Sequence, residues 1–264
     1  MALDCDCKPT PRWSLREDPG LRNGDTRHCI ALGWGDKCKV ALDVSLAVVI
    51  LILALPVIAL AALAVKLTSR GPILYCQTRT GRGGRPYTIY KIRSMRHNCE
   101  GKTGACWSLP GDSRITLVGY FLRHTHVDEL PQLWNVIRGD MSLVGPRPER
   151  PEFVGKLAAV FPDYHKRLAV RPGVSGLAQI QLPADTDLES VRRKLLYDLY
   201  YVEHRSLWLD IRIVLSTACK VAAIPFAVPC AVLRIPSAAV VENGRRQSND
   251  KAELATLLPA ALSM

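Results

Sequence analysis

The longest apolar stretch of the chain runs from Val40 to Val65, and Asp43 is its only charged residue. Its last part, from Val44 to Val65, is about 22 residues long, which is enough for a helix to cross the hydrocarbon core of a bilayer. Pro56 lies in the middle of this part. Because proline lacks an N–H donor and its ring crowds the preceding turn, we expect the helix to bend there.

Both flanks of the apolar stretch are basic. Lys37 and Lys39 precede it, and Lys66 and Arg70 follow it. The positive-inside rule depends on an asymmetry of lysine and arginine between the two sides of a membrane, so it does not orient this helix. Two arrangements fit these features: a helix that dips into one leaflet and returns, and a plain single span that tolerates its proline.

The pattern changes after the apolar stretch. Between Gly71 and Arg96 two β-prone runs enclose a Gly-rich basic turn, which predicts a β-hairpin. The glycines expected at its tip are Gly81, Gly83 and Gly84, and the basic residues there are Arg79, Arg82 and Arg85. These arginines either meet anionic lipid headgroups or form an ordinary solvated turn.

From Glu189 to Ala223 the apolar residues recur at helical spacing, which predicts an amphipathic helix that packs on the core. The chain is weakly patterned after Pro225, and Glu242–Lys251 is expected to be disordered. The sequence therefore predicts an α/β fold that is mostly helical with a small β-hairpin. Its parts are a polar arm (1–36), a membrane-inserted helix (37–69), a folded domain (70–224) and a C-terminal tail (225–264).

The charge balance narrows the partners. The chain has 35 Lys and Arg residues against 24 Asp and Glu, a formal charge of +11, which favours an anionic partner. With only 6% aromatic residues and no zinc-finger spacing or RNP-like run, nucleic acid is the weaker option. The remaining candidates for the anionic partner are a membrane surface and a phosphorylated substrate.

The nine cysteines are scattered and odd in number, and no secretory signal peptide precedes them. We therefore expect reduced thiols facing a cytoplasm rather than a disulfide framework. The spacing of Cys5, Cys7, His28 and Cys29 matches no established zinc pattern.

Two adjacent acids, Asp128 and Glu129, stand just before Pro131. Adjacent residues do not share a face of a regular helix, so the two carboxylates are expected to point in different directions. One interpretation is structural: Asp128 caps a helix whose first turn contains Pro131. The other gives the two acids separate chemical roles.

Several cations could meet this pair of acids, many of them in Gly- or Pro-rich stretches whose backbone N–H groups can also bind an anion. They are Lys91, Arg93, Arg96, Arg123, Arg147 and Arg171. Arginine suits phosphate oxygens because its planar guanidinium donates two parallel hydrogen bonds. A carboxylate among them could hold Mg²⁺ against a diphosphate, or attack phosphorus and form an acyl phosphate.

These motifs resemble those of the bacterial sugar transferase family, the monotopic polyprenyl-phosphate phosphoglycosyl transferases. The resemblance runs from about Lys39 to Lys220 and rests on several ordered blocks. They are KVALD, GPILYCQTRTGRGGRPYTIYKIRSMR, GDSRITLVGYFLRHTHVDELPQLWNVIRGDMSLVGPRPE, RPGVSGLAQI and YDLYYVEHRSLWLDIRIV. So many blocks in order make the resemblance specific, unlike a single short motif.

The resemblance implies a re-entrant helix in the cytoplasmic (inner) membrane, with residues 70–224 as the catalytic domain on the cytoplasmic face. It implies transfer of sugar-1-phosphate from a nucleotide diphosphate sugar, with uridine favoured, to polyprenyl phosphate. Asp128 would attack phosphorus and form a phospho-aspartate, and Glu129 would help to hold Mg²⁺. Arg123 and Arg147 look like phosphate contacts. The resemblance leaves oligomeric state open, with a homo-oligomer as one alternative.

The chain departs from the family pattern at a few positions. Leu55 precedes Pro56 where serine is frequent, which puts the sharpness of the break in question, and His126 is unusual between Arg123 and Asp128. Two rival functions remain: a membrane-anchored scaffold of a polysaccharide assembly complex that has lost catalysis, and a basic membrane-surface or nucleic-acid binder. The intact Asp128 and Glu129 favour the enzyme.

Overall fold

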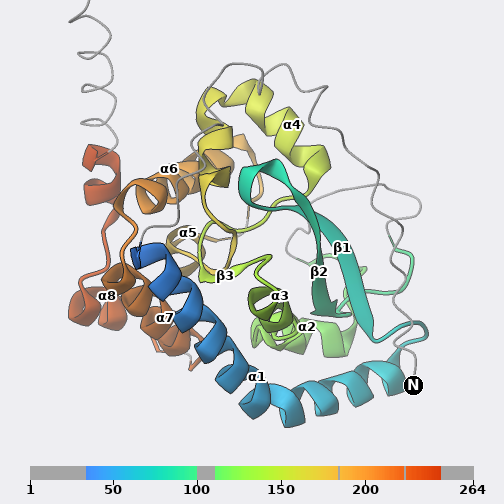
Figure 1. Cartoon of the computed structure of the whole chain (residues 1–264). Helices are drawn as coiled ribbons and strands as arrows, with labels where there is room; N and C mark the ends of the chain where they lie inside the picture. The colour runs from blue at the N-terminus through green and yellow to red at the C-terminus, as the bar shows by residue number, and fades with distance from the viewer. Residues whose placement is uncertain (1–33, 100–110, 184, 223, 245–264) are drawn as a thin grey trace, which may run out of the picture.

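The computed structural model describes residues 34–99, 111–183, 185–222 and 224–244. The predicted N-terminal arm and the predicted disordered segment Glu242–Lys251 lie largely outside these ranges. Within them the chain is mostly helical and carries two two-stranded sheets (Figure 1). The prediction of a mostly helical chain with a small β-hairpin is confirmed.

The elements follow one another from the long first helix to short helices near the C-terminus. The α-helices are α1 (Trp34–Thr68), α2 (Leu117–His124), α3 (Gln132–Ile137), α4 (Pro151–Val160), α5 (Leu177–Gln181), α6 (Leu188–His204), α7 (Leu207–Val221) and α8 (Ala227–Leu233). The 3-10 helices are η3 (Arg82–Gly84), η4 (Val127–Glu129) and η5 (Pro162–Ala169). The strands are β1 (Leu74–Thr80), β2 (Pro86–Ile92), β3 (Ser142–Val144) and β4 (Gly173–Ser175).

Helix α1 is the one helix in the described ranges that is long and apolar enough to cross a membrane. Many of its side chains are not covered by the rest of the protein: Leu53, Leu60 and Leu67 are each more than two-thirds exposed. Pro56 lies within the helix, and Figure 1 shows the helix axis changing direction near its middle. The helix is therefore bent but unbroken.

The first part of α1 is attached to the rest of the chain by buried polar groups. The Lys39 ammonium lies 2.7 Å from the Asp210 carboxylate of α7, and the Ser142 hydroxyl of β3 donates to Asp43 at 2.6 Å. Asp43 and Asp210 are both less than one-tenth exposed. The single charge of the apolar stretch therefore has partners, as a buried carboxylate requires.

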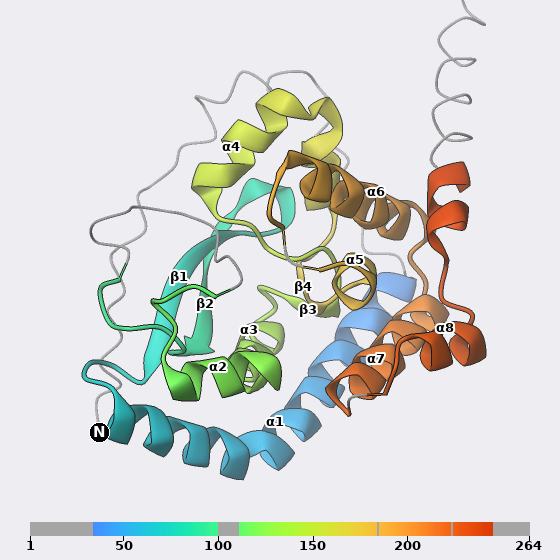
Figure 2. The ribbon, with the colours of Figure 1, turned by 180° about the vertical axis from the view of Figure 1, so that it is seen from behind.

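The last part of α1 is attached by apolar contacts. Ala61 and Val65 are buried in one cluster with Ile92 of β2 and Leu122 of α2. In both views α1 runs along one side of the molecule, with α2 beside its later half (Figures 1 and 2). Both ends of the bent helix therefore contact the same folded domain.

The predicted β-hairpin is present, with β1 antiparallel to β2 and Leu74 opposite Ile92. Its tip is η3, where Gly83 and Gly84 have positive φ angles of 65° and 78° that favour glycine. The tip packs against η5 and lies far from α1 in both views (Figures 1 and 2). An encounter between its arginines and headgroups around α1 does not fit this placement. The solvated-turn alternative is favoured for Arg82 and Arg85, whereas Arg79 is partly buried and donates to the Pro148 carbonyl at 3.0 Å.

The sequence did not predict the second sheet, in which β3 pairs in parallel with β4. Its strands are only three residues long and are joined by α4 and η5, so no local pattern shows that they pair. The sheet brings the Gly-Pro-rich blocks that follow and precede its strands into close contact. A Cβ atom at Gly145 would lie 2.4 Å from the Arg171 carbonyl, so this approach requires glycine.

The amphipathic stretch from Glu189 to Ala223, predicted as one helix, forms two, α6 and α7. The chain is extended at Arg205, and the Ser206 side chain caps α7 by accepting from the Leu209 N–H at 3.2 Å. A serine cap competes well with helix continuation because it satisfies one of the free N–H groups of the new helix. The single-helix prediction was therefore wrong at this junction.

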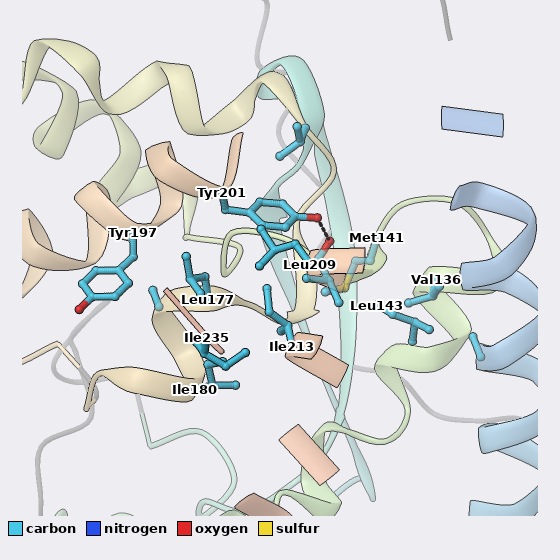
Figure 3. Close-up of a cluster of buried hydrophobic side chains, with 14 of the residues drawn as sticks. Val136, Met141, Leu143, Leu177, Ile180, Tyr197, Tyr201, Leu209, Ile213 and Ile235 are labelled. Carbon is cyan, nitrogen blue, oxygen red and sulfur yellow. Dashed lines mark hydrogen bonds between the residues drawn. The ribbon is translucent and has the colours of Figure 1, made fainter. Parts of the chain in front are cut away.

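The largest hydrophobic core lies between α3, the β3–β4 sheet, α5, α6 and α7 (Figure 3). Tyr201 is buried there, and its hydroxyl lies 3.0 Å from the Val144 carbonyl and 2.8 Å from the Asp210 carboxylate, so its single proton can be donated to either acceptor. The segment after Pro225, predicted to be weakly ordered, contains α8 and contributes the buried Ile235 to this core. Apolar side chains too sparse to show a period can still pack once the core exists.

The cysteine prediction needs one correction. Cys76 on β1 is disulfide-bonded, whereas Cys38, Cys219 and Cys230 are free thiols. Disulfide formation depends on the distance between two residues in the fold, which their spacing along the chain does not encode.

Candidate active site

A cavity of about 1390 Å³ opens between the hairpin, η4, the loop after β3 and the end of α7. Asp128 and Glu129 both line it. So do most of the predicted cations: Lys91, Arg93, Arg96, Arg123 and Arg147. Segments far apart in the sequence thus place acids and cations around one space.

The two acids lie in the 3-10 turn η4, which begins after His126 in a left-handed conformation with φ of 59°. Helix α3 starts only at Gln132, with Pro131 as its N-cap residue, so the prediction that Asp128 caps a regular helix was wrong. Successive residues of a 3-10 turn are about 120° apart around its axis. The two carboxylates can therefore have different surroundings, as the contacts below show.

Glu129 is held by two cations. Its carboxylate lies 2.7 Å from the Lys91 ammonium and 2.8 Å from the Arg147 guanidinium. Burial raises the pKa of Glu129, but Arg147 and Lys91 outweigh burial and hold this pKa well below its usual range. Glu129 is therefore a permanent carboxylate that orients both cations at the cavity.

Asp128 has a different environment. It is only 6% exposed, and within the part of the chain that the structure describes no hydrogen bond or ion pair reaches its carboxylate. Burial and then the neighbouring charge of Glu129 raise the pKa of Asp128 to about 6, against the opposing effect of Lys91, Arg123 and Arg147. This carboxylate faces the cavity without a committed partner, which is the state expected of a nucleophile.

Arg123 reaches the cavity from α2. Its Nε donates to the Ser94 hydroxyl at 2.9 Å, and its charge acts on Asp128. The Thr116 hydroxyl caps α2 by accepting from the Gly119 N–H at 2.9 Å. A Cβ atom at Gly119 would lie 1.8 Å from the Ser94 carbonyl, so glycine lets α2 pack against the end of β2 and sets the position of Arg123.

The other predicted cations differ in placement. Arg96 is exposed at the cavity wall. Arg93 contributes to the wall, but its Nη2 donates to the Ser69 carbonyl at 2.9 Å and hydroxyl at 2.8 Å, which directs the guanidinium to the end of α1. Arg171 does not line the cavity. Its backbone carbonyl packs on Gly145 instead, because β4 pairs with β3 there.

Lys220 lines the cavity but was not predicted from the sequence as a site residue, and the same holds for Arg79, Arg114, Arg150 and Lys194. The ammonium of Lys220, at the end of α7, donates to the Gln179 carbonyl at 2.8 Å. Burial and then the charge of Arg147 lower the pKa of Lys220, while Glu129 opposes this shift. Lys220 lies at the end of a stretch that was predicted as a helix packed on the core, and no neighbouring motif in the sequence indicated that it lines a binding site.

The donor set at the cavity is compatible with Mg²⁺. In the described ranges no three His, Cys, Asp or Glu side chains are grouped so that they could hold a metal ion by themselves. Asp128 and Glu129 supply two carboxylates, and Glu129 Oε2 accepts only a long 3.5 Å contact from Arg147. Mg²⁺ commonly binds one or two protein carboxylates and completes its octahedron with substrate phosphates and water, so these residues fit it.

Fold and site together define a mostly helical protein with one apolar helix beside a basic cavity that holds two acids. The sequence pattern of the bacterial sugar transferase family matches residues 34–223. The chain belongs to this family, as its motif blocks predicted.

Three relatives illustrate the similarity. The chain is 44% identical over 179 residues to UDP-N-acetylgalactosamine-undecaprenyl-phosphate N-acetylgalactosaminephosphotransferase of Aeromonas hydrophila, covering 68% of this chain and 42% of the relative. It is 46% identical over 184 residues to UDP-glucose:undecaprenyl-phosphate glucose-1-phosphate transferase of Caulobacter vibrioides, covering 69% and 68%. It is 41% identical over 187 residues to exopolysaccharide production protein PSS of Rhizobium leguminosarum, covering 68% and 92%.

The extent of these matches differs. The chain spans less than half of the Aeromonas relative and most of the Rhizobium relative. The relatives also differ in the sugar that their names specify. The matched region is therefore shared by proteins that differ in length and in the sugar that their names specify.

Proposed function

We propose that this protein transfers sugar-1-phosphate from a UDP-sugar to undecaprenyl phosphate, the first membrane step in assembling an exopolysaccharide, O-antigen, capsule or glycoprotein glycan. The names of the relatives support the reaction class. The observation that carries the proposal is the contrast between the two acids. Glu129 is paired with two cations, whereas Asp128 faces the same cavity with no ion pair to any described residue and with its pKa raised to about 6.

In the first step an Asp128 carboxylate oxygen attacks the phosphorus that bears the sugar. The bond from that phosphorus to the bridging oxygen breaks, UMP leaves with the bond electrons, and a phospho-aspartate carrying the sugar remains. In the second step an oxygen of the lipid phosphate attacks the same phosphorus and releases the Asp128 carboxylate. The product is a lipid diphosphate sugar, and each step forms one P–O bond and breaks one.

The surrounding cations stabilise the phosphate oxygens during both steps. Arg147, Lys91 and Arg123 line the cavity around Asp128, and phosphoryl transfer depends chiefly on such positioning and charge neutralisation. Asp128 and Glu129 would hold Mg²⁺, which neutralises diphosphate charge when bound. The low pKa of Glu129 keeps it ionised for this role throughout the neutral range.

We also propose that α1 is re-entrant, with both ends on the cytoplasmic face. Its first part is joined to Asp210 and Ser142, and its last part packs on Ile92 and Leu122. A spanning helix would separate its two ends by a hydrocarbon core about 30 Å thick. Contacts of both ends with one domain therefore favour entry into and return from a single leaflet.

Exposed apolar side chains next to α1 support the same arrangement. They lie on α2, α7 and α8, which are found toward the α1 side of the molecule in both views (Figures 1 and 2). They include Leu117, Tyr120, Phe121, Trp208, Ile211 and Val232. Leu117 is 89% exposed and Trp208 67% exposed, values that suit contact with lipid better than contact with water.

The topology is tested by labelling thiols from one side of the membrane. Cys38 near the start of α1 is a free, exposed thiol, and Thr68→Cys places a second thiol at the exposed end. An impermeant maleimide is expected to label both positions only in inside-out vesicles. The single-position variants, Cys38→Ser with Thr68→Cys and native Cys38 alone, are made in a background with the other eight cysteines replaced by serine and assign each signal. Labelling of the two positions from opposite faces would show that α1 spans.

The reaction is tested with purified full-length protein, undecaprenyl phosphate and a panel of radiolabelled UDP-sugars. Label is expected to move into an organic-extractable lipid in the presence of Mg²⁺, and EDTA is expected to stop the transfer. The sugar that supports the highest kcat/KM identifies the donor. A protein that binds UDP but transfers none of the sugars would instead support the inactive scaffold.

A further inference from the structure

A buried ion pair lies outside the cavity. Arg167 on η5 and Asp198 on α6 are 3% and 2% exposed, and their charged groups lie 2.7 Å apart. Replacing such a pair with apolar residues is often neutral or even stabilising, because removing two charges from water is costly. Stability alone is therefore a weak explanation for this pair.

The contacts of Arg167 lead to the active site. The same Nη2 that meets Asp198 also donates to the backbone carbonyl of Arg147 at 2.8 Å. Its Nη1 donates to the Tyr164 hydroxyl at 2.8 Å, and the guanidinium lies over the Tyr164 ring at 5.1 Å. Arg167 is thus fixed on several sides while it holds the main chain at Arg147.

The Arg147 side chain needs such a hold. The side chain is 37% exposed, and its guanidinium lies 2.8 Å from the Glu129 carboxylate at the cavity. A long side chain in that position loses rotamer freedom when it binds an anion. If the main chain at Arg147 is fixed, the Arg147 guanidinium has fewer positions available to it.

We infer that Arg167 and Asp198 are positioning residues that fix the backbone of Arg147 so that its guanidinium meets both Glu129 and the diphosphate of the nucleotide sugar. This role rests on the proposed function. Asp198 orients Arg167, Arg167 holds the Arg147 carbonyl, and Arg147 contacts the substrate. Lysine cannot replace Arg167 fully, because its single ammonium cannot reproduce the planar fork that reaches Asp198, Arg147 and Tyr164 together.

A double-mutant cycle tests whether Arg167 acts through Arg147. Arg147→Met is expected to lower kcat/KM by about 100-fold, the scale of losing one charged transition-state contact. Arg167→Lys is expected to lower it by about 10-fold. If Arg167 acts through Arg147, the double variant should be no worse than Arg147→Met alone. If kcat/KM of the double variant falls by about 1,000-fold, the product of the two single losses, the two residues act independently and the inference is overturned.

The Kd for UDP is a second measurement, and it does not depend on turnover. It is determined by calorimetry with Mg²⁺ and without acceptor lipid. Arg167→Lys is expected to weaken UDP binding about fivefold, in the same direction as Arg147→Met and again without addition in the double variant. If wild-type protein binds UDP but transfers no sugar, the proposed reaction fails while this measurement still tests the positioning. Unchanged UDP binding in Arg167→Lys would overturn the inference.

Two further variants separate positioning from folding. The Arg167→Met, Asp198→Leu double variant removes both charges together, so it avoids a lone buried charge and is expected to fold. It should lose kcat/KM about as much as Arg167→Lys. Tyr164→Phe removes one bond of Arg167 but leaves its contact with Arg147, and activity is expected to stay within about twofold of wild type. An equal loss in Tyr164→Phe would indicate general loosening of the core instead.

Discussion

Replacing Asp128 with asparagine is expected to abolish sugar-phosphate transfer, with a loss of about 10³-fold or more, because an amide cannot form the phospho-aspartate. Radiolabel transfer from the UDP-sugar into lipid measures this loss. UDP should still bind, since Arg147 and Lys91 keep their partner Glu129. Asp163→Asn is the matched control, because Asp163 lies in an exposed ion pair with Lys166.

The same substitution is expected to stabilise the fold at pH 7. Because the pKa of Asp128 is raised in the folded protein, ionisation of Asp128 destabilises the fold relative to the unfolded chain. The contribution of protonated Asp128 to the free energy of unfolding is complete below the unfolded pKa near 3.8 and is lost as the pH rises through about 6. Asparagine removes the penalty of ionisation, which is on the order of 3 kcal/mol. The thermal midpoint should rise by about 8 °C. Full transfer activity in Asp128→Asn would refute its assignment as nucleophile.

Replacing Glu129 with glutamine is expected to have the opposite effect on stability. The change leaves the Lys91 and Arg147 cations without their anion, although Arg147 is partly exposed and solvent screens part of the loss. The free energy of unfolding should fall by about 1–2 kcal/mol. Transfer should fall by about 100-fold, because both cations lose their orientation and the proposed Mg²⁺ site loses one ligand.

Glu189→Gln is the control for this second substitution. Glu189 pairs with Arg192 at 2.9 Å, and both side chains are more than half exposed. Exposed pairs contribute little, so neither the thermal midpoint nor transfer should change measurably. Neighbouring acids with opposite effects on the thermal midpoint would establish that Asp128 and Glu129 have separate roles. A thermal midpoint lowered equally by both substitutions would contradict this division.

Local patterns predicted the parts of the fold that depend on local contacts. The bend position in α1 followed from one proline in an apolar run, and the hairpin followed from two β-prone runs around glycines. The break at Arg205 was missed, since a serine cap within an otherwise periodic stretch gives a weak signal. The β3–β4 sheet was missed because its pairing joins three-residue strands through a long connection.

The site could be predicted to a similar extent. The predicted residues Asp128 and Glu129 line the cavity, and five of the ten described Lys and Arg residues that line it were predicted from the motif blocks as site cations. The direction of each guanidinium could not be read from the motif blocks, because it depends on partners elsewhere in the chain. Arg93 contacts Ser69 at the end of α1, and the importance of Arg167 appears only in its contact with the Arg147 carbonyl.

The attachment of α1 at its first turns sets the order in which the protein can mature. Lys39 pairs with Asp210, which lies 171 residues further along the chain. At ribosomal rates of about 5–20 residues per second, roughly 10–30 s pass between the synthesis of these two residues. During that interval the apolar helix is already made while its docking surface on α7 does not yet exist. The proposed membrane insertion of α1 and its packing against α7 are therefore separate events in the life of each molecule, and the second waits for nearly the whole domain that follows α1.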